Sequence, residues 1–160
     1  MVSIVNVGTG IIQLVIAIIL AVVALYIGFW VFGRITKLDE QKELANGNVA
    51  VGILIASIFI AIGIVVGSGL AGISSGLSKA TEGNFIALAA GIIQLVLGII
   101  FAIVAIYIAL KVIDKLTPRI PLFEELKKGN VAAALAMSGV TVTTAIIIQS
   151  GVLGITSALV

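Results

Sequence analysis

The side chains that could do chemistry in this chain are a few amides and hydroxyls set within otherwise apolar runs. Five of them stand out: Gln13, Gln94, Ser138, Thr141 and Gln149. Inside a membrane, such groups hydrogen-bond between helices or line a path for a polar solute. The sequence leaves both interpretations open, and these five residues form the candidate polar path.

The composition excludes several kinds of chemistry. The chain has no His and no Cys, so it has no imidazole or thiolate metal ligand, no thiol nucleophile and no disulfide. Its acids sit beside Lys and Arg in loops, where solvated ion pairing explains them. No phosphate loop or nucleophile elbow accompanies them. We therefore expect no enzyme activity, no catalytic residue, no metal and no cofactor. The acids concerned are Asp39, Glu40, Glu43, Asp114, Glu124 and Glu125.

The elements that position these residues follow from hydropathy. With 61% hydrophobic and 10% charged residues and a mean hydropathy of +1.36, the chain is typical of a membrane protein. Each charge-free run exceeds the roughly 20 residues that cross a bilayer. The first run lacks a basic start and is too long for a signal peptide, so we expect it to remain. We predict an all-α polytopic protein, a single domain over residues 1–160, with four spans in the charge-free runs 1–33, 44–78, 83–110 and 129–160.

The basic residues predict the orientation. The loops 34–47 and 111–129 hold all but one of the 9 Lys and Arg residues, so they should face the cytoplasm and leave both termini outside a cell membrane. The loop 111–129 has a net charge of +2, which is enough for weak attraction to anionic lipid but not for nucleic-acid recognition. The expected partners are the lipid bilayer, further copies of the chain, and a cytoplasmic protein at these two loops.

The chain contains a duplicated unit. The stretch 10–27 reappears as 91–108 with thirteen of eighteen positions identical, and after a one-residue insertion 47–50 matches 129–132. The repeats cover about 5–78 and 84–160. Because each has two membrane helices, both insert with the same orientation. We therefore expect a parallel repeat, with a pseudo-twofold or ring axis along the membrane normal.

Each repeat also predicts a short interfacial helix in its cytoplasmic loop. These helices should cover Asp39–Asn46 and Pro121–Lys128, with Pro121 at the first helical position. Gly47 and Gly129 can end them in a left-handed conformation. Asn48 and Asn130 can then cap the following membrane helices.

One motif carries a family resemblance. An apolar helix is followed by a Thr117-Pro118 loop and then by Glu-Glu-Leu-Lys-Lys-Gly-Asn-Val-Ala-Ala-Ala from 124 to 134, which opens the next helix. The pattern occurs twice, although the first copy lacks the Thr-Pro. It resembles the membrane family called domain of unknown function 350. The resemblance implies a multi-pass protein of paired two-helix units and supplies no reaction.

Small residues at helical spacing predict the faces on which the helices pack, because packing replaces the hydrophobic effect in lipid. The first and third spans have the longest such stripes. The set comprises Gly10, Gln13, Ala17, Ala21, Ala24 and Gly28, then Gly91, Gln94, Gly98, Ala102, Ala105 and Ala109, then Gly52, Ala56, Gly63 and Gly67, and finally Ala134, Ser138, Thr141, Ala145 and Gln149.

Two functions fit these features. The uncharged runs are longer than a bilayer needs, so the helices must tilt or be covered by protein, which favours a homo-oligomer. No Asp, Glu, Lys, Arg or His lies within a predicted span, so proton-coupled transport is not expected. We expect a homo-oligomeric structural or scaffolding assembly. The alternative is a passive channel or facilitator for a small polar solute or ion, lined by Gln13, Gln94, Ser138 and Thr141.

Overall fold

The computed structural model of the protein describes residues 4–36, 38–81 and 83–159. Lys37 and Glu82, which belong to predicted loops, lie outside these ranges. The protein is 89% helical, with no strand in the described residues. The helices are α1 (Ile4–Thr36), α2 (Glu40–Ala45), α3 (Val49–Thr81), α4 (Phe85–Leu116), α5 (Leu122–Lys127) and α6 (Val131–Leu159).

Four of these helices are long and apolar enough to cross a membrane. The apolar spans of α1, α3, α4 and α6 have 24 to 32 residues. At about 1.5 Å per residue they reach or exceed the roughly 30 Å of hydrocarbon. A helix suits these sequences because it satisfies every backbone amide and carbonyl within one segment. The prediction of an all-α polytopic membrane protein is confirmed.

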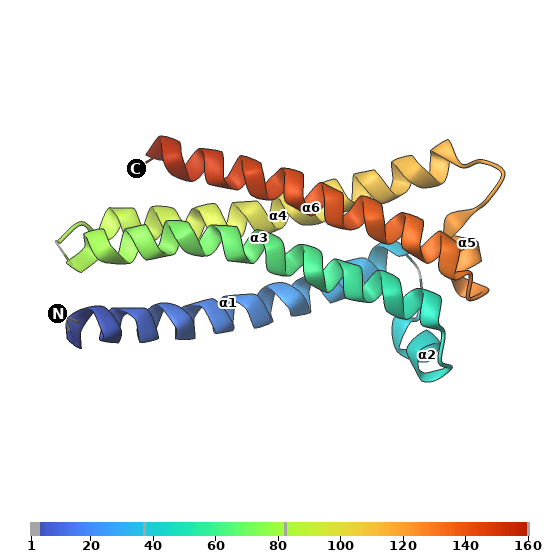
Figure 1. The fold of residues 1–160 in the computed structure, drawn as a ribbon, viewed down its shortest axis with the longest axis horizontal. Coiled ribbons are helices and arrows are strands. Elements are labelled where there is room, and N and C mark those ends of the chain that lie inside the picture. Colours follow the sequence, from blue (N-terminus) through green and yellow to red (C-terminus); the bar gives the residue numbers. More distant parts are fainter. Residues whose placement is uncertain (1–3, 37, 82, 160) are drawn as a thin grey trace.

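The helices run so that both repeats point the same way. In Figure 1, α2 and α5 lie at one end of the bundle, while α1 begins and α6 ends at the other. We call α1 to α3 repeat 1 and α4 to α6 repeat 2. Helix α3 is central and packs on α1, α4 and α6, whereas α1 and α6 lie on opposite sides of it.

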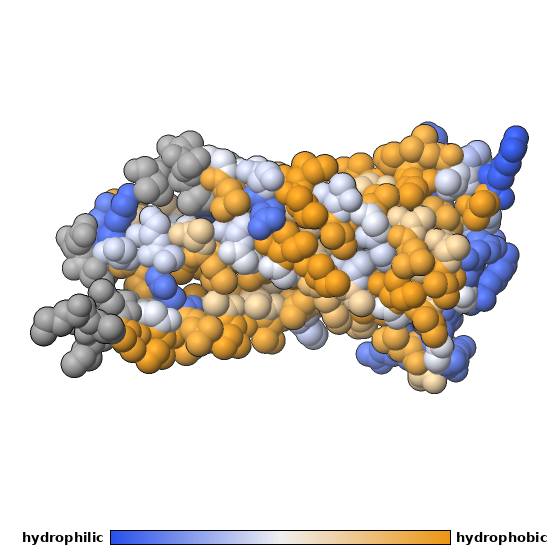
Figure 2. All heavy atoms as spheres, viewed as in Figure 1, coloured by the Kyte–Doolittle hydropathy of each residue, from blue (hydrophilic) through white to orange (hydrophobic). Residues whose placement is uncertain are grey.

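The core lies mainly along α3. Its most buried side chains include Ala50, Val51, Leu54, Ala61 and Val65, each at most 1% exposed. The outer surface is apolar as well. Figure 2 shows hydrophobic side chains along the bundle and hydrophilic ones gathered towards its ends, most densely around α2 and α5. This pattern matches a lipid-covered middle between two polar boundaries.

The two short helices are slightly shorter than predicted. Asp39 and Asn46 flank α2 as its N-cap and C-cap, and the Asp39 carboxylate accepts a hydrogen bond from the Lys42 amide at 3.1 Å. Pro121 is the N-cap of α5 rather than its first helical residue. The reason lies in α4, because Asp114 Oδ1 accepts a hydrogen bond from the Leu122 amide at 3.0 Å and so caps α5 from outside.

Candidate functional site

Gln94 joins α4 to α6 near the end of the bundle opposite α2 and α5. Its side chain is 7% exposed, and its Nε2 donates a hydrogen bond to the carbonyl oxygen of Val152 at 2.9 Å. A buried amide without such a partner would be costly in an apolar environment. Gln94 is therefore part of the packing between the two membrane helices of repeat 2.

Gln13, the counterpart of Gln94, makes a similar bond in repeat 1. Its Nε2 donates to Ser74 Oγ at 2.9 Å and to the Ser74 carbonyl oxygen at 3.4 Å. The Gln94 acceptor, Val152, corresponds to Leu70, so Gln13 reaches one helical turn further along α3. Sequence reasoning did not single out Ser74. No local pattern in the sequence marks Ser74 as the acceptor, because the bond depends on how far α1 slides along α3.

The remaining residues of the candidate polar path lie on α6. Ser138 Oγ donates to the carbonyl oxygen of Ile53 at 3.4 Å and so contacts α3. Thr141 is fully buried and donates to the Met137 carbonyl of its own helix at 2.9 Å. Gln149 is half-buried. Ser138 and Thr141 therefore take part in packing and in bonds to the helix backbone.

The structure does not bring the five residues of the candidate path into one cavity. Gln13 lines an open hollow between α1 and α3, together with Ser74. Gln94 lines another between α4 and α6, together with Val152. Within one chain, the hydrogen-bonding role of these amides is visible and a continuous polar lining is not seen among the described residues.

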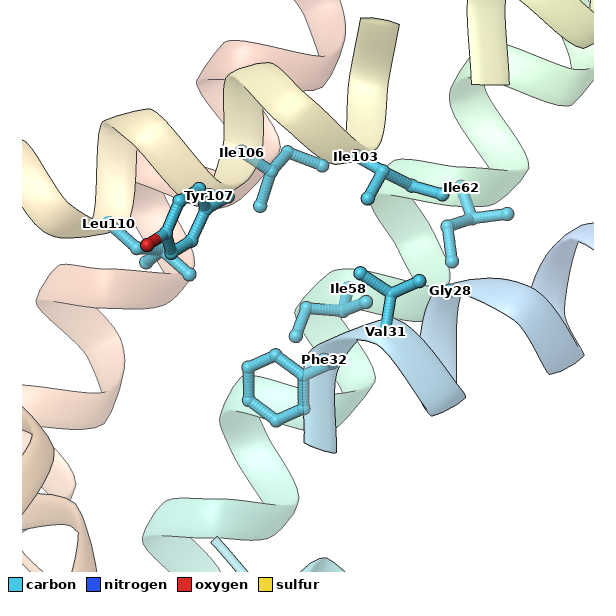
Figure 3. A pocket seen from close by; sticks show the side chains of 9 residues that line it. All are labelled: Gly28, Val31, Phe32, Ile58, Ile62, Ile103, Ile106, Tyr107 and Leu110. Atoms are coloured by element: carbon cyan, nitrogen blue, oxygen red, sulfur yellow. The ribbon is translucent and has the colours of Figure 1, made fainter. Parts of the chain in front are cut away.

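A small cavity inside the bundle is apolar. It has a volume of about 30 Å³ and lies between α1, α3 and α4. Figure 3 shows its lining, which is aliphatic or aromatic throughout, with side chains from all three helices. A cavity of this size holds about one water molecule only if polar partners surround it. Because its lining is apolar, this cavity is a packing gap and not part of a path for water. Its lining residues are Gly28, Val31, Phe32, Ile58, Ile62, Ile103, Ile106, Tyr107 and Leu110.

Glycines let α3 and α4 approach at backbone distance. A Cβ atom added to Gly91 would lie 2.6 Å from the carbonyl oxygen of Gly72. One added to Gly76 would lie 2.6 Å from the carbonyl oxygen of Ala87, and one added to Gly69 would overlap the Leu95 side chain. Sequence reasoning selected Gly91 but not the three glycines of α3 at this helix contact. Their spacing of three and four residues was the missed signal.

Other predicted packing residues also lie at helix contacts. A Cβ added to Gly28 would overlap Ile62, and one added to Gly98 would lie 3.1 Å from Val152. Ala24 and Ala102 are buried. On α6, Ala134 and Ala145 are fully buried. Four other predicted packing residues of α1 and α4 are half-buried, namely Ala17, Ala21, Ala105 and Ala109.

The predicted packing face of the second span does not pack within one chain. Ala56, Gly63 and Gly67 are exposed, and no neighbour comes within 4 Å of a Cβ added to either glycine. Gly52 is half-buried beside Leu44. The physical reason is that α3 turns its other face, which carries Leu54 and Ala61, towards repeat 2. Gly10 on α1 is likewise exposed with no neighbour within 4 Å.

Asn48 is the centre of a junction at the α2 end. Gly47 has a φ of 74°, so it ends α2 in the left-handed conformation that favours glycine. Asn48 Oδ1 then accepts from the Val51 amide at 3.2 Å and caps α3. Its Nδ2 donates to Glu43 Oε2 at 2.7 Å and to the carbonyl oxygen of Leu126 at 3.0 Å. Asn48 therefore connects repeat 1 to repeat 2.

Repeat 2 has the equivalent local junction, in which the described bonds of Asn130 all stay within the repeat, and its Gly129 has a φ of 81°. Asn130 Oδ1 accepts from the Ala132 amide at 3.0 Å, and its Nδ2 donates to Glu125 Oε2 at 2.8 Å. Lys128 Nζ lies 2.8 Å from Glu125 Oε1. The hydrogen bonds from Asn130 and then Lys128 hold the pKa of Glu125 below its ordinary value, and the bond to Glu125 raises the pKa of Lys128.

Two of the acidic residues, Glu40 and Asp114, take part in helix contacts and capping. Glu40 is 7% exposed, and its carboxylate oxygens lie where a side chain on Gly33 would begin, 2.8 Å from an added Cβ. In repeat 2 the residue corresponding to Gly33 is Asp114, which caps α5. In the part of the chain that the structure describes, no three His, Cys, Asp or Glu side chains come together in a way that could hold a metal ion.

Comparisons with known proteins identify the family. No curated protein and no solved structure matches the chain. The family model described as Domain of Unknown Function (DUF350) matches residues 6–152, which include both repeats up to the last turns of α6. The chain belongs to the Domain of Unknown Function (DUF350) family.

Proposed function

We propose that this protein is the subunit of a homo-oligomeric structural assembly in a cell membrane. Several copies pack through their membrane helices and together carry α2 and α5 on the cytoplasmic side, with both termini outside. The positive-inside bias of the loops 34–47 and 111–129 supports this orientation. The proposal assigns no reaction, because the acids have structural partners: Asp39 and Asp114 cap helices, Glu43 and Glu125 accept hydrogen bonds from Asn48 and Asn130, and Glu40 lies against Gly33.

The observation that carries the proposal is a face of α3 that one chain leaves open. Ala56, Gly63 and Gly67 are exposed. The residues at the equivalent positions of α6 are Ser138, Ala145 and Gln149, which are half-buried or buried. Small residues allow the close helix contacts that stabilise association in lipid. This face is covered by protein on α6 but open on α3. The face of α3 is therefore available for a helix from another copy.

The cytoplasmic end supports a role in holding a protein partner. An open groove of about 640 Å³ lies beside α2, and its lining combines aromatic and polar side chains, among them Tyr26, Trp30, Asp39 and Gln41. Tyr26 and Trp30 are exposed, as expected for aromatic residues at a membrane boundary. An assembly would present one such groove per copy.

A passive channel is the second candidate. The hollows beside Gln13 and Gln94, of about 400 and 240 Å³, favour it because an amide residue is part of the lining of each. In an assembly, such surfaces could meet and form one polar lining. This candidate predicts solute or ion flux that depends on the two amides.

The subunit number and the flux together test the proposal. Native mass spectrometry of protein released from nanodiscs should give a defined complex of several copies. Liposomes containing the same preparation should show no flux of small solutes or ions above that of empty vesicles. A monomer would contradict the assembly. Flux that the double variant Gln13→Leu and Gln94→Leu abolishes in an intact complex would favour the channel.

A further inference from the structure

The two repeats of one chain pack head to tail and not around a twofold axis. Helix α3 packs extensively on α4 and on α6. A twofold axis relating the repeats would pair the contact of α3 with α4 with an equivalent contact of α6 with α1. The described residues of α1 and α6 form no comparable contact. Each repeat therefore uses a different surface in the shared interface. One complementary surface stays open on each side of the chain.

Repeat 2 has an open surface on α6. It corresponds to the face of α3 with which repeat 1 packs on repeat 2. Positions of α1 and α4 correspond with an offset of 81, as Gly10 and Gly91 do, and those of α3 and α6 with an offset of 82, as Asn48 and Asn130 do. Buried residues of α3 consequently have exposed counterparts on α6. The buried set is Leu54, Ser57, Ala61, Val65 and Gly72, and the exposed counterparts are Ala136, Gly139, Thr143, Ile147 and Gly154.

Repeat 1 also has an open surface. It corresponds to the surface of repeat 2 that packs against α3. Leu95 is 1% exposed against Gly69, but its counterpart Leu14 is 60% exposed. Leu126, which accepts the bond from Asn48, is fully buried, but its counterpart Leu44 is 45% exposed. The side chains needed for a second interface are thus present and uncovered.

We propose that a second copy of this chain covers these surfaces. Repeat 1 of the second copy docks on repeat 2 of the first copy, with the same contacts that join repeat 1 to repeat 2 within one chain. This inference rests on the proposed homo-oligomer and specifies its geometry. The internal interface sets the contacts. Ile53 with Ser138 becomes Leu135 with Ala56, and Asn48 with Leu126 becomes Asn130 with Leu44. Gly69 with Leu95 becomes Gly151 with Leu14, and Gly72 with Gly91 becomes Gly154 with Gly10.

The open surfaces are matched for this docking. Gly10, Gly151 and Gly154 are exposed, and a Cβ added to any of them meets nothing within 4 Å. The glycines that correspond to them lie in the internal interface, where Gly91 meets the backbone of Gly72 and Gly69 meets the Leu95 side chain. Because the repeats are parallel, the same step repeats around an axis along the membrane normal. Copies then add side by side in the membrane until the ring closes.

Disulfide cross-linking between differently tagged chains tests this geometry, since the chain has no cysteine of its own. One chain carries Leu135→Cys and the other carries Ala56→Cys, a pair equivalent to Ile53 and Ser138, whose carbonyl oxygen and Oγ lie 3.4 Å apart. After the two are mixed in one membrane, oxidation should join one tag to the other. Each variant oxidised by itself should stay uncross-linked, because a head-to-tail contact never brings two identical positions together.

Two controls make the result decisive. Ile53→Cys with Ser138→Cys in one chain should form the internal disulfide and thereby report correct packing of the repeats. Val23→Cys mixed with Val104→Cys should not cross-link, because these equivalent residues are 48% and 49% exposed and face lipid in both repeats. Cross-links between identical variants, or an intact oligomer without the Leu135 to Ala56 link, would overturn the head-to-tail geometry alone. A monomer in native mass spectrometry would overturn the proposed function as well.

Discussion

The side-chain amide of Asn48 donates a hydrogen bond to the main-chain carbonyl oxygen of Leu126, 3.0 Å away, and so connects the two repeats at their α2 and α5 end. Asn130 occupies the equivalent place in repeat 2. Among the described contacts it bonds to Glu125 and to the start of α6, all within its own repeat. The same sequence motif thus has a contact between repeats in one copy and only local contacts in the other.

This difference predicts unequal effects of two matched substitutions. Asn48→Ala and Asn130→Ala each remove a helix cap, which costs about 1 kcal/mol. Asn48→Ala also removes the bond to Leu126, which adds about 1 kcal/mol. Reversible unfolding of monomeric protein in mixed SDS micelles measures both free energies. Equal losses for the two variants would show that the contact between repeats contributes nothing.

Gln94 should contribute more to stability than Gln13. Gln94→Leu removes the buried bond to Val152, and we expect a loss of about 0.6 to 2 kcal/mol in the free energy of unfolding. Gln13→Leu removes a bond at a half-buried site and should cost less. The same unfolding titration compares them. A larger loss for Gln13→Leu would contradict the packing described for these two amides.

Gly91→Ala should destabilise the contact of α3 with α4. The added methyl group would lie 2.6 Å from the Gly72 carbonyl oxygen, and a backbone atom cannot turn aside as a side chain can. Overpacking of this kind costs about 1 to 3 kcal/mol. Gly63→Ala is the control, because nothing lies within 4 Å of that site in one chain. Monomeric Gly63→Ala protein should unfold at the same or a slightly higher denaturant concentration than the parent.

The junction around Glu125 predicts a dependence on pH. Hydrogen bonds from Asn130 and then Lys128 lower the pKa of Glu125 from its ordinary value of 4.5. A carboxylate whose pKa is lowered on folding stabilises the fold above its unfolded pKa, and this contribution is lost as the pH falls through the lowered value. An NMR titration should show a larger upward pKa shift for Asn130→Ala than for Lys128→Met. The reverse order would identify Lys128 as the main cause.

The orientation can be tested with single cysteines. Ser78→Cys, near the end of α3, should react with a membrane-impermeant maleimide added to intact cells. Gln41→Cys, on α2, should react only after the cells are opened. The opposite pattern would invert the proposed topology and place α2 and α5 outside.

Much of the fold was readable from the sequence, because hydropathy and the repeat carry long-range information. The charge-free runs predicted α1, α3, α4 and α6, and the duplicated motif predicted α2 and α5 within one residue at either end. The glycines at 47 and 129 have the left-handed φ values that their place between two helices requires. These features are local, so neighbouring residues are enough to define them.

The contacts between repeats could not be predicted in the same way. Helices of similar composition have several small-residue faces, and the sequence does not say which one meets a neighbour. Gly63 and Gly67 have the spacing of an interface but are exposed in one chain, whereas Gly72 and Gly76 form the close contact. The acceptors of Gln13 and Gln94 depend on how far each helix slides along its neighbour, which no local pattern encodes.

The most direct measurement is the number of chains that move together in a bilayer, counted by single-molecule photobleaching of labelled protein at high dilution in lipid. The proposed assembly predicts several bleaching steps per spot for the parent and for Gly8→Leu, which alters an exposed glycine whose counterpart Ala89 is also exposed. It predicts single steps for Gly139→Leu, because leucine there would obstruct an open face of α6, where nothing in the same chain lies within 4 Å of an added Cβ. Single steps for the parent protein would contradict the assembly.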